Sequence, residues 1–219
     1  MKCMTFPIFP SLLAALLFSC GHQLAGNGSE ITNGNCIAEA APAESAMVVA
    51  YPQYYVPSSP AVAPETTFTD SKGYFSMRLG RCGWNLVIYD KARVRGAFVP
   101  LSSGDSTLDT IVLNDLGAIA GIVNDTLGGP RSVGIIGSPF YADIIGKADT
   151  FSIVKIPPHY YSFDVWRLTD ELSDTSSNNV FHSPNVFHSD TSLNSNFALV
   201  GSDIVWVLPD STTMFIINY

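Results

Sequence analysis

Short apolar runs separated by Gly, Pro, Asn and Asp recur along the chain, and no window of helical length shows an apolar period of 3.6 residues. This pattern is typical of an all-β protein, because side chains alternate between the two faces of a strand. The predicted strands cover residues 45–51, 73–79, 84–89, 96–101, 108–113, 118–123, 133–137, 150–156, 160–166, 196–200, 204–208 and 213–217.

Alternation within these strands predicts which side chains are buried. Trp84, Leu86 and Ile88 point to one face, while Asn85 and Val87 point to the other. A later strand has the same inward pattern at Tyr161, Phe163 and Val165. Because each sheet then has one apolar face, a second sheet must cover it, and we expect antiparallel β-sandwiches.

An internal repeat divides the chain. Residues 73–79 and 84–88 match residues 149–156 and 161–165 at an offset of 76 or 77 residues, and residues 106–113 resemble 191–199. We therefore predict two tandem modules, at 35–116 and 117–219. The chain ends in two apolar runs, Ile204–Leu208 and Thr213–Ile217, whose short polar connection predicts a hairpin that either completes the second module or begins a third.

Two phrases resemble a known family. Thr69–Ser76 contains a T-D-x-x-G-x-F segment, and Ile119–Val123 and Ile156–Tyr161 resemble an opening strand and a later turn. These segments are similar to the carboxypeptidase regulatory-like, or transthyretin-like, β-sandwich. The resemblance implies a prealbumin-type fold and brings no peptidase activity, since the zinc peptidase signature His-x-x-Glu is absent.

The amino terminus has the features of a secretion signal. Lys2 precedes an apolar run that ends at Phe18, which is too short to span a membrane and contains Pro7 and Pro10. Leu17–Cys20 resembles the lipobox of bacterial lipoproteins, which implies a signal peptide at 1–19 and lipidation of Cys20. The alternative is an ordinary secretory peptide cleaved after Gly21. Residues 20–34 are rich in Gly and Asn and are predicted to be a flexible tether.

The charge balance argues against nucleic acid as a partner. The chain has 11 Lys and Arg against 19 Asp and Glu, and a formal net charge of −8. Phosphate binding requires a basic cluster, and none exists in the sequence.

Cysteine usage predicts a disulfide. If Cys3 leaves with the signal and Cys20 carries lipid, Cys36 and Cys82 remain. In an oxidising compartment such a pair favours a disulfide, although two separate buried thiols are the alternative.

No motif identifies a reaction. The Gly-x-Ser-x-Gly elbow of serine hydrolases is absent. His182 and His188 lie six residues apart in a small tandem duplication, with Asp190 nearby, but an exposed duplicated loop explains them better than a metal site. We predict a non-enzymatic protein without cofactor or metal.

Aromatic residues supply the remaining functional hint. Exposed rings can stack on sugars, and the candidates are Tyr51, Tyr54, Tyr55, Tyr89 and Trp166. Ordinary packing is the competing interpretation. We therefore predict a lipid-anchored structural or interaction protein of the bacterial cell envelope, at the outer membrane, with envelope proteins as partners. The alternative is a glycan-binding lipoprotein.

Overall fold

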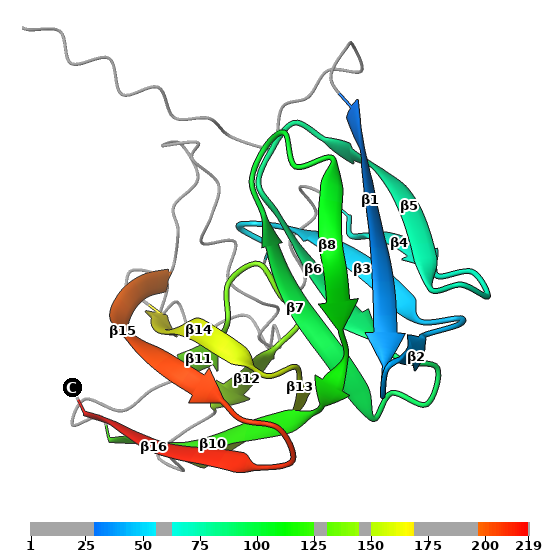
Figure 1. Cartoon of the computed structure of the whole chain (residues 1–219). Helices are drawn as coiled ribbons and strands as arrows, with labels where there is room; N and C mark the ends of the chain where they lie inside the picture. Colours follow the sequence, from blue (N-terminus) through cyan, green and yellow to red (C-terminus); the bar gives the residue numbers. More distant parts are fainter. Residues whose placement is uncertain (1–28, 56–62, 125–130, 145–149, 169–196, 219) are drawn as a thin grey trace, which may run out of the picture.

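The computed structural model describes residues 29–55, 63–124, 131–144, 150–168 and 197–218, and within these ranges every regular element is a β-strand (Figure 1). The fold is all-β, as predicted. The strands up to Asp115 form one pair of sheets, the first sandwich, and those from Gly117 form another pair, the second sandwich.

The first sandwich has a sheet in which β1 lies between β5 and β8, and a five-stranded sheet with the order β4-β3-β6-β7-β9. Its strands are β1 (Ser29–Ala38), β2 (Ala41–Pro42), β3 (Met47–Pro52), β4 (Glu65–Phe68), β5 (Tyr74–Gly80), β6 (Trp84–Tyr89), β7 (Arg95–Leu101), β8 (Thr107–Val112) and β9 (Asn114–Asp115).

The second sandwich has sheets with the orders β13-β10-β16 and β12-β11-β14-β15. Its strands are β10 (Gly117–Asn124), β11 (Arg131–Gly134), β12 (Tyr141–Ile144), β13 (Thr150–Ile156), β14 (His159–Leu168), β15 (Phe197–Val207) and β16 (Thr212–Asn218).

The two sandwiches share one topology. In the first, β1 pairs antiparallel with β5 and parallel with β8; in the second, β10 pairs antiparallel with β13 and parallel with β16. The sheet β4-β3-β6-β7 likewise corresponds to β12-β11-β14-β15. The predicted repeat is therefore visible in the structure, with β5 and β6 equivalent to β13 and β14.

One part of the predicted repeat is wrong. Residues 106–113, which contain β8, were matched to 191–199, of which 191–196 lie outside the described residues. Phe197–Leu199 belong to β15, the counterpart of β7, whereas the counterpart of β8 is β16.

The predicted carboxyl-terminal hairpin is also wrong. β15 pairs with β14, and β16 pairs with β10 in the opposite sheet. The connection from residue 208 to 211 therefore crosses from one sheet to the other. Each strand buries its own apolar face in the core, which a free hairpin could not do.

The predicted tether is too long, because β1 begins at Ser29 and lies in the middle of its sheet. Its inward residues, Thr32, Gly34 and Cys36, are small or polar, so the strand lacks an apolar alternation. At Gly34 an added Cβ would come within 2.6 Å of the Phe75 ring, which explains why this strand needs a glycine.

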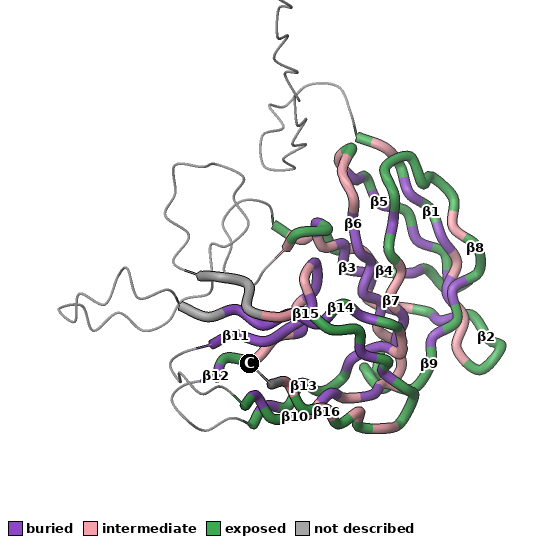
Figure 2. Tube along the Cα trace, turned by 90° about the vertical axis from the view of Figure 1, so that its left-hand side faces the viewer, coloured by how far each residue is buried: buried purple, intermediate pink, exposed green. Residues whose placement is uncertain are grey.

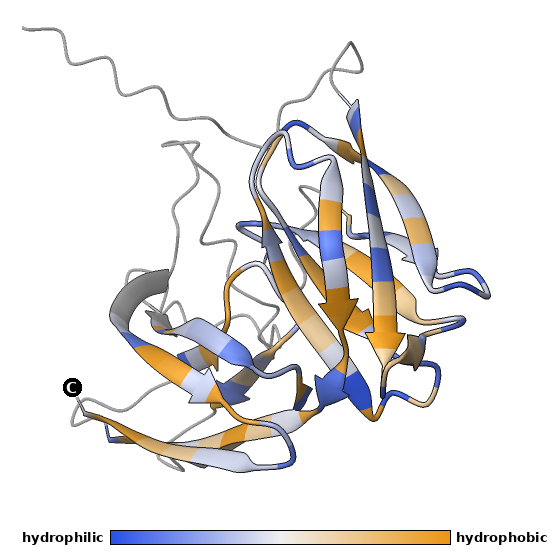
Figure 3. Cartoon of the chain, viewed as in Figure 1, coloured by the Kyte–Doolittle hydropathy of each residue, from blue (hydrophilic) through white to orange (hydrophobic). Residues whose placement is uncertain are grey.

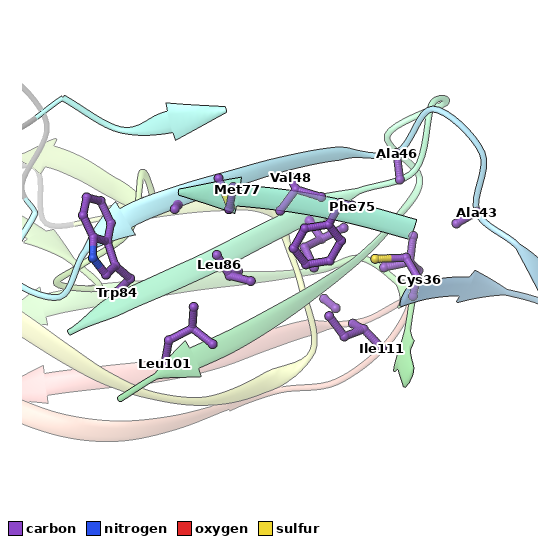
Figure 4. Packing of buried hydrophobic residues seen from close by; sticks show 14 of the residues in the cluster. Cys36, Ala43, Ala46, Val48, Phe75, Met77, Trp84, Leu86, Leu101 and Ile111 are labelled. Atoms are coloured by element: carbon purple, nitrogen blue, oxygen red, sulfur yellow. The ribbon is translucent and has the colours of Figure 1, made fainter. Parts of the chain in front are cut away.

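The core of the first sandwich confirms the predicted inward set. Trp84, Leu86 and Ile88 pack with Phe75 and Met77 (Figure 4). In the second sandwich Tyr161, Phe163 and Val165 are likewise buried.

Candidate functional site

The outer face of the β3-β6-β7 sheet is covered by the second sandwich. Val87 on β6 has no exposed surface and belongs to the second core rather than the first. Phe98 on β7 contacts the Tyr161 ring at a centroid distance of 4.9 Å and the His159 ring at 5.1 Å. β6 is therefore buried on both faces, between the two sandwiches (Figure 2). We call this contact the seam.

Backbone and amide groups fix the geometry of the seam. The Asn85 side chain donates from Nδ2 to the Gly137 carbonyl at 3.0 Å, and the Gly137 N–H donates to the Tyr55 carbonyl at 2.8 Å. Gly137 has a φ of 72°, and a Cβ there would lie 2.2 Å from the Asn85 Nδ2 atom. The turn after β11 therefore requires this glycine in order to dock on β6.

Three of the tyrosines predicted to stack on sugars lie at the seam. Tyr51 and Tyr89 pack against the second core, and Tyr55 contacts the Tyr51 ring at a centroid distance of 4.9 Å. The Tyr89 hydroxyl donates to the Lys155 carbonyl at 3.0 Å. Burial raises the pKa of all three phenols, and a neighbouring phenol adds to each shift. Their observed role is packing, whereas Tyr54 is 58% exposed.

The prediction that Trp166 faces solvent is wrong, because the side chain is only 3% exposed. Alternation does place Trp166 on the opposite face from Val165, but this end of that face is enclosed. Ser132, directly across in β11, and Asp164 are buried as well. Trp166 is therefore not available as a platform for a sugar.

The predicted disulfide between Cys36 and Cys82 is not formed, and the Cys36 thiol is free and buried. Because Ser29 pairs with Gly80 and Asn35 with Tyr74, the two cysteines lie toward opposite ends of β1. Seven residues of strand correspond to roughly 24 Å, against the ~6 Å between Cα atoms that a disulfide requires. In Figure 4, Cys36 and Trp84, which follows Cys82 by two residues, lie at opposite ends of the core. Burial raises the pKa of the Cys36 thiol to about 12.

The structure presents an aromatic pair that the sequence did not single out. Tyr160 on β14 and Trp206 on β15 are directly opposite, with ring centroids 3.6 Å apart and planes tilted by 48°. Their side chains are 62% and 38% exposed. Tyr160 immediately precedes the inward Tyr161, so the alternation already assigned it to the outer face.

Hydroxyl groups lie beside this pair. Ser162 and Ser202 are exposed, and their Oγ atoms are 3.2 Å apart. The Ser162 hydroxyl donates to the Asp164 carboxylate at 3.5 Å. Burial raises the pKa of Asp164, while its hydrogen bonds with Ser202 and Ser162 act in the opposite direction.

Several predicted site residues lie outside the described residues: Cys20, His182, His188 and Asp190. In the described ranges no group of three or more His, Cys, Asp or Glu is arranged to hold a metal ion. Those same ranges contain no helix long and apolar enough to cross a membrane.

Comparison with known proteins gives only distant structural likenesses. No known family matches the chain, and no curated protein matches it. Solved structures similar to it include two DUF3823 family proteins. The one from Bacteroides ovatus has 11% identity and a TM-score of 0.32, over 63% of this chain and 89% of its own. The one from Parabacteroides merdae has 10% identity and a TM-score of 0.28, over 64% and 92%.

A minor pilin from Streptococcus agalactiae is also similar, with 8% identity and a TM-score of 0.31, over 85% of this chain and 94% of its own. Scores this low carry no argument about function. The fold assignment rests on the chain's own strand pairing.

Proposed function

We propose that this protein is a non-catalytic structural element of the bacterial cell envelope, anchored through lipid on Cys20. The seam is the observation that supports this proposal most directly. Val87 is shared with the second core, and Asn85 and Gly137 connect the two sandwiches through hydrogen bonds. Two sandwiches joined in this way form a stiff unit rather than two independent domains on a linker.

The proposed anchor fits this arrangement. The leader and the Leu17–Cys20 lipobox support export and acylation, and eight residues separate Cys20 from the first residue of β1. A short connection of this kind would keep the first sandwich close to a membrane surface. Two or more long acyl chains would make the attachment effectively permanent, since each buried methylene contributes about 0.8 kcal/mol.

We also propose that the two sandwiches are of the carboxypeptidase regulatory-like, or transthyretin-like, type. Both sandwiches carry the turn and strand segments on which the resemblance was based, at Thr69–Ser76 and at Ile156–Tyr161. In the first, the Asp70 carboxylate accepts hydrogen bonds from the backbone N–H groups of Lys72 and Tyr74 at 2.8 and 2.9 Å. Gly73 has a φ of 80°, as this turn requires.

Cell fractionation of the Cys20→Ser variant tests the anchor. We expect the native protein in the membrane fraction and the variant in the soluble fraction. Cys36→Ser is the matched control, because it removes a thiol without touching the lipobox. A Cys20→Ser variant that stays in the membrane fraction, at the same level as the control, would exclude lipid anchoring.

A further inference from the structure

The exposed aromatic pair is specific to the second sandwich. In the first, the register pair equivalent to Tyr161 and Val205 is Trp84 and Leu101. One step further along the strands lie Gly83 and Ser102, where the second sandwich has Tyr160 and Trp206. The topology is the same in both places, so the fold itself does not require aromatic rings there.

The outer face of β14 and β15, which carries the aromatic pair, differs chemically from the outer face of β6 and β7, which the second sandwich covers. On the covered face of the first sandwich, the cross-strand pair is Val87 and Phe98, both apolar. The equivalent pair on β14 and β15 is Asp164 and Ser202. The outer face of β14 and β15 therefore has a polar pair at the position where the first sandwich has the apolar pair that packs in the seam.

The same face offers the two kinds of contact that a sugar needs. A pyranose ring has an apolar C–H face and a rim of hydroxyl groups. The rings of Tyr160 and Trp206 provide an exposed apolar surface. Ser162 lies one side-chain step from Tyr160, about 7 Å along β14, and Ser202 lies two steps from Trp206, about 14 Å along β15, with the exposed Ile204 between them. The two serine Oγ atoms are 3.2 Å apart, so the hydroxyls form one group at the end of the apolar surface. The Asp164 carboxylate is itself buried, so it orients the Ser162 hydroxyl rather than contacting a ligand.

Charge narrows the class of sugar. The chain has a formal net charge of −8. An anionic polysaccharide would be repelled by this excess of negative charge.

We infer that the outer face of β14 and β15 binds a neutral polysaccharide, with sugar rings stacked on Tyr160 and Trp206 and their hydroxyls bonded to Ser162 and Ser202. This site goes beyond the proposed anchoring role and does not depend on Cys20.

Native affinity electrophoresis of the purified protein tests the inference, in gels that contain soluble starch, mixed-linkage β-glucan, xyloglucan or galactomannan. We expect at least one of these polysaccharides to retard the protein. Trp206→Ala and Tyr160→Ala should each weaken that binding by about tenfold or more, because aromatic side chains dominate such contacts. Tyr74→Ala is the matched control, since Tyr74 is also an exposed tyrosine but lies on β5 of the first sandwich, and its removal should leave retardation unchanged.

The possible outcomes separate this site from the alternatives. Retardation by none of the four polysaccharides would overturn the inference, and so would equal losses in Tyr74→Ala and Trp206→Ala. Concentration-dependent self-association that Trp206→Ala abolishes would assign the face to a second copy of the chain instead. Trp206→Phe, which keeps a ring, should retain part of the binding, so loss of folding in Trp206→Ala would not decide the result. The Cys20→Ser variant should be retarded like the native protein, which keeps this test distinct from that of the anchor.

Discussion

The two sandwiches are alike inside and different outside. In each core a glycine on the central strand faces a phenylalanine ring on its neighbour: Gly34 with Phe75, and Gly121 with Phe151. Each also has a ring donating to a carbonyl four residues earlier: the Trp84 Nε1–H to Gly80 at 2.9 Å, and the Tyr161 hydroxyl to Pro157 at 2.7 Å.

The outer sheets differ. On the β5-β1-β8 sheet, Asn33, Ser76 and Arg78 lie among exposed apolar residues. The β13-β10-β16 sheet instead exposes large apolar side chains, and much of β16 is coloured as hydrophobic in Figure 3. These side chains are Ile122, Val154, Met214 and Ile216. The comparison teaches that the fold constrains the interior of both repeats equally, while each exterior follows its own surroundings.

The largest effect should come from breaking the shared interior. Phe75→Ala and Phe151→Ala each remove a buried ring that packs over a glycine, so each should lower the free energy of unfolding by about 3–5 kcal/mol. Urea denaturation followed by tryptophan fluorescence measures both. A loss below about 1 kcal/mol in either variant would contradict the equivalence of the two cores.

A smaller effect should come from the seam. Phe98→Ala removes the ring that contacts Tyr161 and His159, and we expect a loss of about 2 kcal/mol. Because the seam couples the two cores, the single unfolding transition of the native chain should separate into two. Phe68→Ala, at an exposed position, is the control and should stay within about 0.5 kcal/mol of the native value. An unchanged single transition in Phe98→Ala would show that the sandwiches are coupled elsewhere.

A change of pH should alter the stability of the seam by less than either of these substitutions. Burial lowers the pKa of His159, so the unfolded chain binds this proton more readily than the folded one. The stability associated with the neutral His159 side chain is therefore fully present above the unfolded pKa of about 6.5. It is lost as the pH falls through the pKa of the folded state. Asp164, whose pKa is raised, acts in the opposite direction. We therefore expect urea midpoints of the native chain to fall more steeply than those of His159→Gln between pH 7.5 and 5. Parallel curves for the two proteins would contradict this assignment.

The smallest effect should come from Cys36. Its counterpart in the second core is Val123, two residues beyond the glycine on the central strand, and both side chains have no exposed surface. Cys36→Val should therefore change the free energy of unfolding by less than about 0.5 kcal/mol. A loss of about 2–5 kcal/mol is expected when a native disulfide is removed, and it would indicate that Cys36 is paired with Cys82 after all. Thiol titration of the native and the denatured chain gives an independent check.

The sequence predicted the elements whose inward residues are large. The runs around Phe75, Trp84, Phe151 and Phe163 alternate clearly, and β5, β6, β13 and β14 lie where they were expected. β1 was missed because a strand that packs under a phenylalanine ring needs a glycine there, and that removes the apolar signal.

The candidate site was less predictable, for a related reason. Alternation assigns a side chain to a face but does not say what covers that face. Tyr51, Tyr89 and Trp166 were therefore counted with the exposed rings, although the structure buries them wholly or in part. Tyr160 and Trp206 come together only through the register between β14 and β15, which lie far apart in the chain.

The parallel pairing of β1 with β8 and of β10 with β16 has a mechanical consequence. A pull that draws the amino end of β1 away from the carboxyl end of β8 slides these strands past each other lengthwise, and the same holds for β10 and β16. The hydrogen bonds of such a ladder are evenly spaced and carry the load together, instead of opening one by one. A chain held at one end and grasped at the other would therefore resist extension through these two ladders.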